Sequence, residues 1–430
     1  MLAGRSLPMV LSASALFATW FGSETVFGAS SEFLKGGLLG VIEDPFGAAL
    51  CLLLFGLFFA RKLYHMNLLT LGDFFGARYG KTTERVASIF LVPSYVGYIA
   101  AQLVAMGLII NVVTGVAIWQ GVVVSALVVT AYTYVGGMWA ISITDFIQSI
   151  IIIVGLVVLA FILASKAGGF AAVWNAVPPD DLRILPTFQW REVIVYLAAW
   201  SVLGLGSIPS QDVFQRAMSS GSASIAVRSC YIAAGLYLTV AMLPLFISLC
   251  TRQLYPEQLR GDTQLALPNM VLAHTPLMVQ ILFFGSLLSA IMSTTSSAIL
   301  APAAIFSENI LKPWVGRAMT DRQLLMYTRL SVLLFSAVAT LMACWRSNIY
   351  ELVGESSILS LVSLFVPLTF GLYWRYATAR GALWSMSLGM IAWGLFTYLI
   401  ESHIPPLVPG VLVSLVAMVV GSLLTRLKTA

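Results

Sequence analysis

Charge is scarce in this chain of 430 residues, because Asp, Glu, Lys and Arg together make up only 10% of it. Soluble domains carry roughly a quarter of such residues. Hydrophobic residues account for 59% of the chain. A soluble globular domain of this size is therefore excluded, and the composition indicates an integral membrane protein that has the lipid bilayer as its surroundings.

Residues that form metal sites, disulfide frameworks and catalytic centres are equally scarce. The four cysteines, Cys51, Cys230, Cys250 and Cys344, lie in or at the edge of apolar segments and lack metal-ligand spacing. We interpret them as packing residues. The sequence also lacks a nucleophile–base pair, a phosphate-binding loop and zinc-ligand spacing, so we expect that the protein is not an enzyme.

Long apolar segments are what the sequence has instead. A helix needs about 20 apolar residues to cross roughly 30 Å of hydrocarbon. Twelve segments qualify: 8–28, 46–65, 86–112, 118–136, 142–165, 190–208, 225–250, 276–300, 326–345, 350–373, 381–400 and 406–426. The sequence therefore predicts an all-α polytopic membrane protein with about twelve transmembrane helices in one transporter domain, 1–430.

The basic residues predict the orientation of these segments. If the chain starts in the cytoplasm, sixteen of its 23 Lys and Arg residues flank the cytoplasmic ends of the segments. Because cytoplasmic loops are enriched in Lys and Arg, we expect both termini to be cytoplasmic, in a bacterial inner membrane. This topology also explains the net charge of +5 without a nucleic-acid partner. The sequence does not indicate an oligomeric state.

The first apolar segment is interrupted at its middle by polar residues. Trp20, Gly22, Ser23 and Glu24 lie about fifteen residues into it. A charged residue at this depth costs a few kcal/mol and is usually functional. We therefore predict a helix that is broken at a functional site.

The sixth segment has a similar interruption. Gly204, Gly206 and Pro209 lie close to Trp200 and lower helix stability. Segments one and six are five apart, so they cross the membrane in opposite directions. Paired interrupted segments in an inverted repeat are typical of a transporter and its central binding site.

Polar residues in three other segments are candidates for the same site. Tyr95, Tyr98 and Gln102 share one helical face, which must contact protein or water rather than lipid. Asp145 lies at the cytoplasmic end of segment five. It is either a charge at a helix end that water satisfies, or part of an ion exit path.

The eighth segment concentrates hydroxyl groups. Gly285 to Leu300 contains seven Ser and Thr residues in sixteen. Close helix packing accounts for much of this cluster. It accounts less well for the adjacent residues Ser293 and Thr294, which, with Ala290 one turn earlier, concentrate oxygen atoms at one depth of the helix. Such a group of oxygens favours the coordination of sodium.

Five stretches together resemble the sodium/solute symporter family, nearest its choline-transporter-like branch. They read ATWFGSETVFG at 18–28, DPFGAALCLLLFGLFFA at 44–60, SITDFIQ at 142–148, GSIPSQDVFQR at 206–216 and SAIMSTTSS at 289–297. Two details depart from the choline-like pattern: Ser23 and Glu24 follow Gly22 where the family has further glycines, and Ser210 replaces a tryptophan. The family also has one more span ahead of its first core helix.

The resemblance implies ten core helices in two inverted repeats, with sodium coupling and alternating access. The repeats would cover about 8–165 and 190–373, with additional helices at about 381–426. The implied sodium ligands are the backbone carbonyls of Ala18, Phe21 and Ala290 and the hydroxyls of Ser293 and Thr294. The resemblance also implies that Asp145 belongs to the inner sodium route.

The residues around the two breaks favour a positively charged substrate. The candidate substrate-binding residues are Trp20, Ser23, Glu24, Tyr95, Tyr98, Gln102 and Trp200. An aromatic ring facing an ammonium contributes about 2 kcal/mol when desolvated, whereas a charged Glu24 would oppose an anion. In the alternative interpretation, the tryptophans only pack and Glu24 is a protonated acid bonded to backbone.

We therefore predict a sodium-coupled symporter that imports a small organic solute such as an amine, a quaternary ammonium or a zwitterionic compound. Two alternatives remain: the transporter-like module of a membrane nutrient sensor, or a symporter for an amino acid or monocarboxylate. A passive channel fits less well, because broken helices beside a discrete sodium cluster indicate occlusion.

Overall fold

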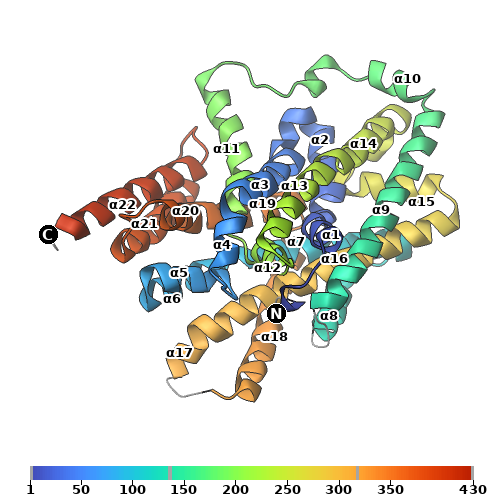
Figure 1. Ribbon diagram of the computed structural model, residues 1–430. Coiled ribbons are helices and arrows are strands. Elements are labelled where there is room, and N and C mark those ends of the chain that lie inside the picture. The colour runs from blue at the N-terminus through green and yellow to red at the C-terminus, as the bar shows by residue number, and fades with distance from the viewer. Residues whose placement is uncertain (1–2, 134–137, 316–318, 428–430) are drawn as a thin grey trace.

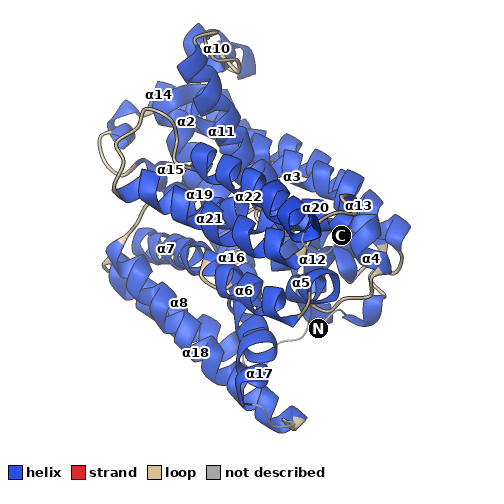
Figure 2. Ribbon diagram, turned by 90° about the vertical axis from the view of Figure 1, so that its left-hand side faces the viewer, coloured by secondary structure: helices blue, strands red, loops and turns tan. Residues whose placement is uncertain are grey.

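The apolar segments fold as helices because lipid offers the backbone no hydrogen-bond partners, so each segment must satisfy its own polar groups. The computed structural model describes residues 3–133, 138–315 and 319–427. Within these ranges the protein consists of helices and loops, with a single bridge between Leu7 and Ser220 (Figure 2). The predicted all-α membrane fold is confirmed.

The helices of the first half run from η1 to α9. Their bounds are η1 Ala3–Arg5, α1 Met9–Ala18, η2 Glu24–Ala29, α2 Ser30–Gly36, η3 Gly37–Val41, η4 Ile42–Gly47, α3 Ala48–Leu54, η5 Phe55–Ala60, α4 Arg61–His65, α5 Leu71–Tyr79, α6 Lys81–Leu91, α7 Ser94–Thr114, α8 Ile118–Thr133 and α9 Met138–Lys166.

The second half runs from α10 to α22. Its helices are α10 Phe170–Asn175, η6 Pro179–Leu182, α11 Trp190–Gly206, α12 Gln211–Met218, α13 Ala223–Val240, α14 Met242–Leu254, η7 Pro256–Leu259, η8 Thr263–Leu265, α15 Ala266–His274, α16 Leu277–Ile305, η9 Phe306–Leu311, α17 Lys312–Val315, α18 Asp321–Trp345, α19 Ile349–Ser360, η10 Leu361–Phe365, α20 Val366–Tyr373, α21 Ala379–Tyr398 and α22 Leu407–Leu427.

Eight helices in the described part of the chain are long and apolar enough to cross a membrane, or nine when α11 and α12 count as one bent span. The eight are Glu24–His65, Lys81–Thr114, Asp145–Lys166, Ala223–Leu254, Leu277–Val315, Arg322–Trp345, Ile349–Tyr373 and Leu407–Arg426. Helices α1 and α8 are apolar but shorter. The number twelve therefore stays a prediction, as do the two repeats.

The stretch Glu24–His65 is not one straight helix. Gly37 has φ 61° and ψ −153°, a conformation that favours glycine because it has no Cβ. Asp44 is extended, with φ −140° and ψ 123°. The chain therefore turns between the first and second apolar segments, as the sequence predicts, and Asp44 begins the second of them inside the protein.

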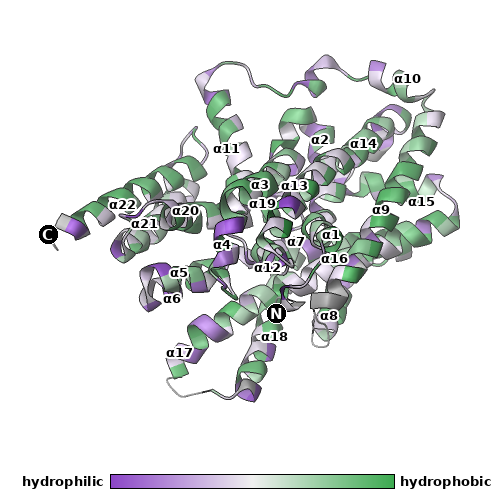
Figure 3. Cartoon of the chain, in the orientation of Figure 1, coloured by the Kyte–Doolittle hydropathy of each residue, from purple (hydrophilic) through white to green (hydrophobic). Residues whose placement is uncertain are grey.

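Helix α7 lies at the centre of the bundle and contacts α8, α16, α18 and α19 (Figure 1). Almost every residue from Ser94 to Ile109 is buried. Hydrophobic residues predominate along the helices of the bundle (Figure 3), and several are exposed on its surface, such as Leu341 at 74%. Such outward-facing apolar surface suits contact with lipid. Helices α21 and α22 pack against each other at one side of the bundle.

Candidate functional site

The first apolar segment is broken where the sequence predicts it. Helix α1 ends at Ala18, four turn residues follow from Thr19 to Gly22, and η2 begins at Glu24. A helix end leaves backbone carbonyls without partners inside the helix, and these carry the negative end of its dipole. The break therefore presents acceptor oxygens in the interior of the bundle.

The hydroxyl cluster of α16 lies against this break. The Thr294 hydroxyl donates a hydrogen bond of 3.2 Å to the Ala18 carbonyl. A Cβ at Gly22 would lie 3.5 Å from Ile291 Cγ1, which places the turn beside α16. Phe21 and Ala290 are buried here too, at 3% and 6% exposure. The structure thus joins Ala18 directly to Thr294. We call this region the sodium corner, after the ion that the family resemblance implies here.

Asp145 on α9 adds a carboxylate to the sodium corner. The Ser293 hydroxyl donates to Asp145 Oδ1 at 2.8 Å. Arg216 Nη2 on α12 lies 3.9 Å from Asp145 Oδ2, and both residues are buried. At that distance neither Nη2 nor Oδ2 has a hydrogen-bond partner. Sequence reasoning missed Arg216, although it closes the 206–216 block that carries the family resemblance.

The second break lies between α11 and α12. Helix α11 ends at Gly206, α12 begins at Gln211, and the two helices are bent by 49°. A cavity of about 40 Å³ lies beside this bend, lined by Trp20, Tyr95, Tyr98, Asp212, Gly206 and six serines. That volume holds little more than one water molecule. The side chains must therefore move before the cavity can admit an organic solute.

Tyr95 joins α7 to the start of α12. Its hydroxyl accepts the backbone N–H groups of Gln211 and Asp212 at 2.6 and 3.2 Å, and it donates to Asp212 Oδ1 at 2.9 Å. This leaves Asp212 Oδ2 without a hydrogen bond from the described residues. Ser210 Oγ, which also lines the cavity, has no partner either. Sequence reasoning missed both residues.

Tyr98 joins α7 to the first break. Its hydroxyl donates to the Thr19 carbonyl at 2.6 Å, while its ring lines the cavity beside Trp20. The predicted polar face of α7 thus contacts both breaks: Tyr98 bonds to the first, and Tyr95, one turn earlier, bonds to the second.

Glu24 belongs to a separate buried group. It accepts hydrogen bonds from the Ser23 hydroxyl at 2.8 Å and from Gln102 Nε2 at 3.2 Å, and it is 3% exposed. None of these three residues lines the cavity. Trp200 lies apart from the cavity as well, because its ring packs against Phe46 and Tyr196.

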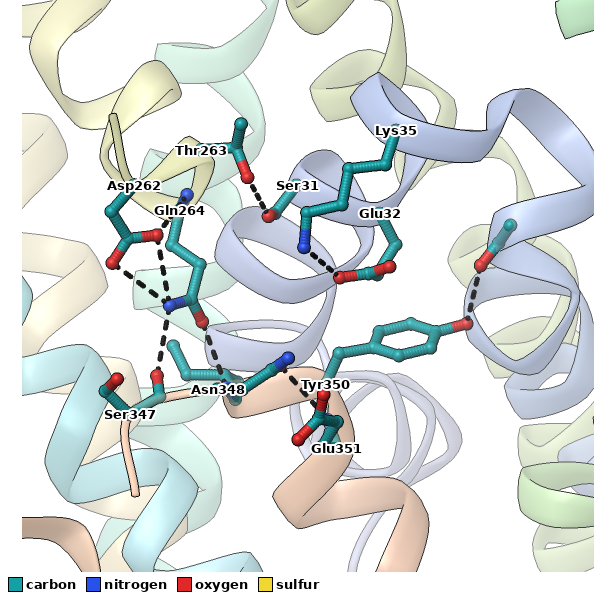
Figure 4. A network of polar contacts seen from close by, with 12 residues as sticks. Ser31, Glu32, Lys35, Asp262, Thr263, Gln264, Ser347, Asn348, Tyr350 and Glu351 are labelled. Carbon is teal, nitrogen blue, oxygen red and sulfur yellow. Dashed lines mark hydrogen bonds and ion pairs between the residues drawn. The ribbon is translucent and has the colours of Figure 1, made fainter. Parts of the chain in front are cut away.

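A network around Gln264 joins three segments at one end of the bundle (Figure 4). Gln264 Nε2 donates to the Ser347 carbonyl at 3.0 Å, and Gln264 Oε1 accepts the Ile349 N–H at 3.0 Å. Next to it, the hydroxyls of Ser31 and Thr263 are hydrogen-bonded. The Gln264 network therefore fastens α2 and η8 to the start of α19.

Comparison with protein families gives a match over most of the chain. The model of the sodium:solute symporter family matches residues 1–389. The human high affinity choline transporter 1 is 30% identical over 397 residues, which cover 88% of this chain and 67% of that protein. The high-affinity proline transporter PutP of Bacillus subtilis is 30% identical over 390 residues, which cover 84% of this chain and 77% of the relative.

Solved structures have the same fold. A substrate-bound, outward-open Na⁺-coupled sialic acid symporter superposes with a TM-score of 0.81 at 19% identity, covering 98% of this chain and 91% of that one. MhsT in complex with L-phenylalanine gives a TM-score of 0.62 at 13% identity, covering 97% of this chain and 99% of its own.

Proposed function

Since the chain belongs to the sodium:solute symporter family, and so couples sodium to the transport of a small solute across a membrane, we propose that its solute is a small organic cation. Amines, quaternary ammonium compounds and zwitterions with an ammonium group are the candidate classes. Its relatives include choline transporters and proline transporters, and choline and proline both carry a positively charged nitrogen.

The observation that carries this proposal is the lining of the cavity. Asp212 supplies a carboxylate with one oxygen free of hydrogen bonds, and Trp20, Tyr95 and Tyr98 supply aromatic faces. Among the described residues, no Lys, Arg or His lines the cavity. A cation gains from both the carboxylate and the rings, and the ring contact alone contributes about 2 kcal/mol when desolvated. The same carboxylate would repel an anionic solute.

We assign the sodium ion to the sodium corner. Its ligands in this proposal are the carbonyls of Ala18, Phe21 and Ala290 and the hydroxyls of Ser293 and Thr294. The hydrogen bond from Thr294 to Ala18 supports this assignment, because it brings two of these oxygens within 3.2 Å. Unwound carbonyls at helix ends are common sodium ligands in transporters.

Asp145 extends the sodium site toward the cytoplasm in this proposal. It is already bonded to Ser293, so an ion leaving the hydroxyl cluster meets a carboxylate next. One sodium ion moving inward gains about 2.3 kcal/mol per 100 mV of membrane potential. This energy is available to concentrate the solute.

In this proposal both termini lie in the cytoplasm, which the charge bias of the loops supports. The Gln264 network, which holds α2, η8 and α19 together, would then lie at the outer end of the bundle. Opening this end would widen the path to the small cavity between α7 and the two broken helices. The proposed cycle therefore requires the Gln264 network to separate when solute enters from outside.

Counterflow in proteoliposomes tests the proposal. Labelled choline, glycine betaine, proline, glucose and lactate are offered in turn, with sodium or potassium on both sides. We expect exchange of one of the three compounds that carry a positively charged nitrogen, in sodium only. Exchange of glucose or lactate alone would contradict a cationic solute.

The same vesicles distinguish the alternatives. A sensor module would be stabilised against heat by its solute without exchanging it, whereas a symporter does both. Uphill uptake driven by a sodium gradient excludes a passive channel.

A further inference from the structure

A second buried carboxylate, Asp44, lies outside the sodium corner and the cavity. It begins the second apolar segment, in η4, and is 1% exposed. Its side chain is bonded by Thr25 of η2 and Tyr237 of α13. No ion pair involves Asp44 among the described residues, in contrast to Asp145 with Arg216.

The oxygens of these three residues form a closed triangle. Thr25 Oγ1 lies 2.9 Å from Asp44 Oδ2, and Tyr237 Oη lies 2.8 Å from Asp44 Oδ1. The two hydroxyl oxygens are themselves 2.6 Å apart. Each of these distances is that of a hydrogen bond between oxygens.

Counting hydrogens shows what the triangle needs. Each of the three contacts requires one proton between its oxygens, but the Thr25 and Tyr237 hydroxyls supply only two. With an ionised Asp44, one contact would place two lone pairs against each other in a buried site, which is unfavourable. A protonated Asp44 supplies the third hydrogen. It donates to Thr25, Thr25 donates to Tyr237, and Tyr237 donates back to Asp44.

The neighbouring acidic residue, Glu24, has enough protons from its hydrogen-bond donors. Glu24 accepts from Ser23 and from Gln102, and each donor brings its own proton. These two contacts therefore require no proton from the Glu24 carboxyl. Asp44 lies close enough to interact with Glu24 electrostatically, and two such carboxyl groups resist carrying two charges.

The other titratable groups that face Asp44 do not supply a positive charge. Glu43 precedes it on the same segment. Tyr237 comes from α13, and Tyr350 of α19 has its hydroxyl 3.4 Å from the Asp44 amide nitrogen. Together with Glu24 on η2, these groups are acidic or neutral. A proton on Asp44 is thus the positive charge that can balance this carboxyl group.

We propose that Asp44 is a proton-binding site that is loaded in the closed arrangement of η2, η4 and α13. Thr25 belongs to the broken first span, so movement of η2 away from α13 opens the triangle and admits water. The Asp44 carboxyl then releases its proton to that water. The proton therefore moves with the conformational cycle, in addition to sodium.

Infrared spectroscopy of the purified full chain tests this proposal without any solute. A protonated carboxyl has a C=O stretching band that is separate from the carboxylate bands and shifts in D₂O. We expect the wild-type protein at neutral pH to show this band, and Asp44→Asn to lose intensity equal to one carboxyl per chain. Glu24→Gln is the matched control, because Asp44→Asn should remove the same intensity of one carboxyl in its background.

Asp44→Asn also tests whether the protein remains folded. Its amide has the shape of the neutral acid and keeps a donor for Thr25, so we expect a melting temperature close to that of the wild type. A folded Asp44→Asn variant whose spectrum retains the full acid band would overturn the proposal. So would a wild-type protein without the band, since Asp44 would then be ionised.

Discussion

Asp145 and Asp44 are both buried in helical spans, but the protein accommodates them in different ways. Asp145 has a guanidinium 3.9 Å away and one hydroxyl donor. Asp44 has two hydroxyl groups as partners, and no ion pair involves it among the described residues. A negative charge thus has a partner in the sodium corner, where we propose that a cation passes. Beside η2, the Asp44 carboxyl is balanced by hydrogen bonding and, in our proposal, by a proton.

Asp212 lies between these two cases. One of its oxygens is bonded to Tyr95, and Asp212 also lines the cavity. A buried carboxylate beside a cavity favours a positively charged group there. In our proposals, three buried aspartates thus serve three cations: Asp145 a sodium ion, Asp44 a proton and Asp212 the solute.

Removing Arg216 should disturb this comparison most. Arg216→Ala leaves the Asp145 charge buried without its partner, which costs about 3–5 kcal/mol of unfolding free energy. Thermal unfolding in detergent measures the loss. Adding Asp145→Asn should restore most of the stability, while Arg380→Ala at the surface is the neutral control. An equally unstable double variant would show that the pair is not the cause.

Sodium binding gives the next largest effect. Sodium at about 100 times its dissociation constant should stabilise the wild type by about 2.7 kcal/mol relative to potassium. Ser293→Ala with Thr294→Ala removes two proposed ligands and should abolish that difference. Ser286→Ala is a matched control, because this hydroxyl on the same helix bonds its own backbone at Leu282. A sodium effect that survives in the double variant would remove both hydroxyls from the site.

Neutralising Asp212, the aspartate that lines the cavity, should weaken solute binding. Asp212→Asn removes a buried charge opposite the proposed cation, which costs at least about 2 kcal/mol, or roughly thirtyfold in affinity. Sodium-dependent uptake of the solute found by counterflow gives the half-saturation concentration. Asp180→Asn, at an exposed position, should leave it unchanged. An unaltered half-saturation in Asp212→Asn would place the solute elsewhere.

The Gln264 network should show the smallest effect. Gln264→Ala removes the acceptor of the Ile349 N–H, a loss of about 1 kcal/mol. Hydrogen exchange at the start of α19 should accelerate about fivefold. Gln120→Ala on α8 is the control. Unchanged exchange at Ile349 would show that other contacts hold this end closed.

Much of the site follows from the sequence because its residues lie near the two breaks. Gly22 and the polar residues after it predict where α1 ends, and hydroxyl spacing predicts that Thr294 faces a partner. The partner itself, Ala18, lies 276 residues away and is implied by the family resemblance rather than by spacing.

Other residues were beyond sequence reasoning for a physical reason. Periodicity shows which face of α7 is polar but does not separate Tyr95, at the cavity, from Gln102, at Glu24. Asp212 lies 117 residues from the tyrosine that positions it. Trp200 is close to a break in sequence, yet its ring packs against Phe46 and it does not line the cavity.

The bonds to two consecutive carbonyls at the first break have a mechanical consequence. Thr294 holds the Ala18 carbonyl, and Tyr98, a wall of the cavity, holds the Thr19 carbonyl. The two carbonyls belong to adjoining peptide units, so a change in the backbone torsions at Thr19 would alter both hydrogen bonds. In the proposed cycle, this short shared stretch of backbone links release of sodium to rearrangement of the cavity. Such a link opposes slippage, the passage of an ion without its solute.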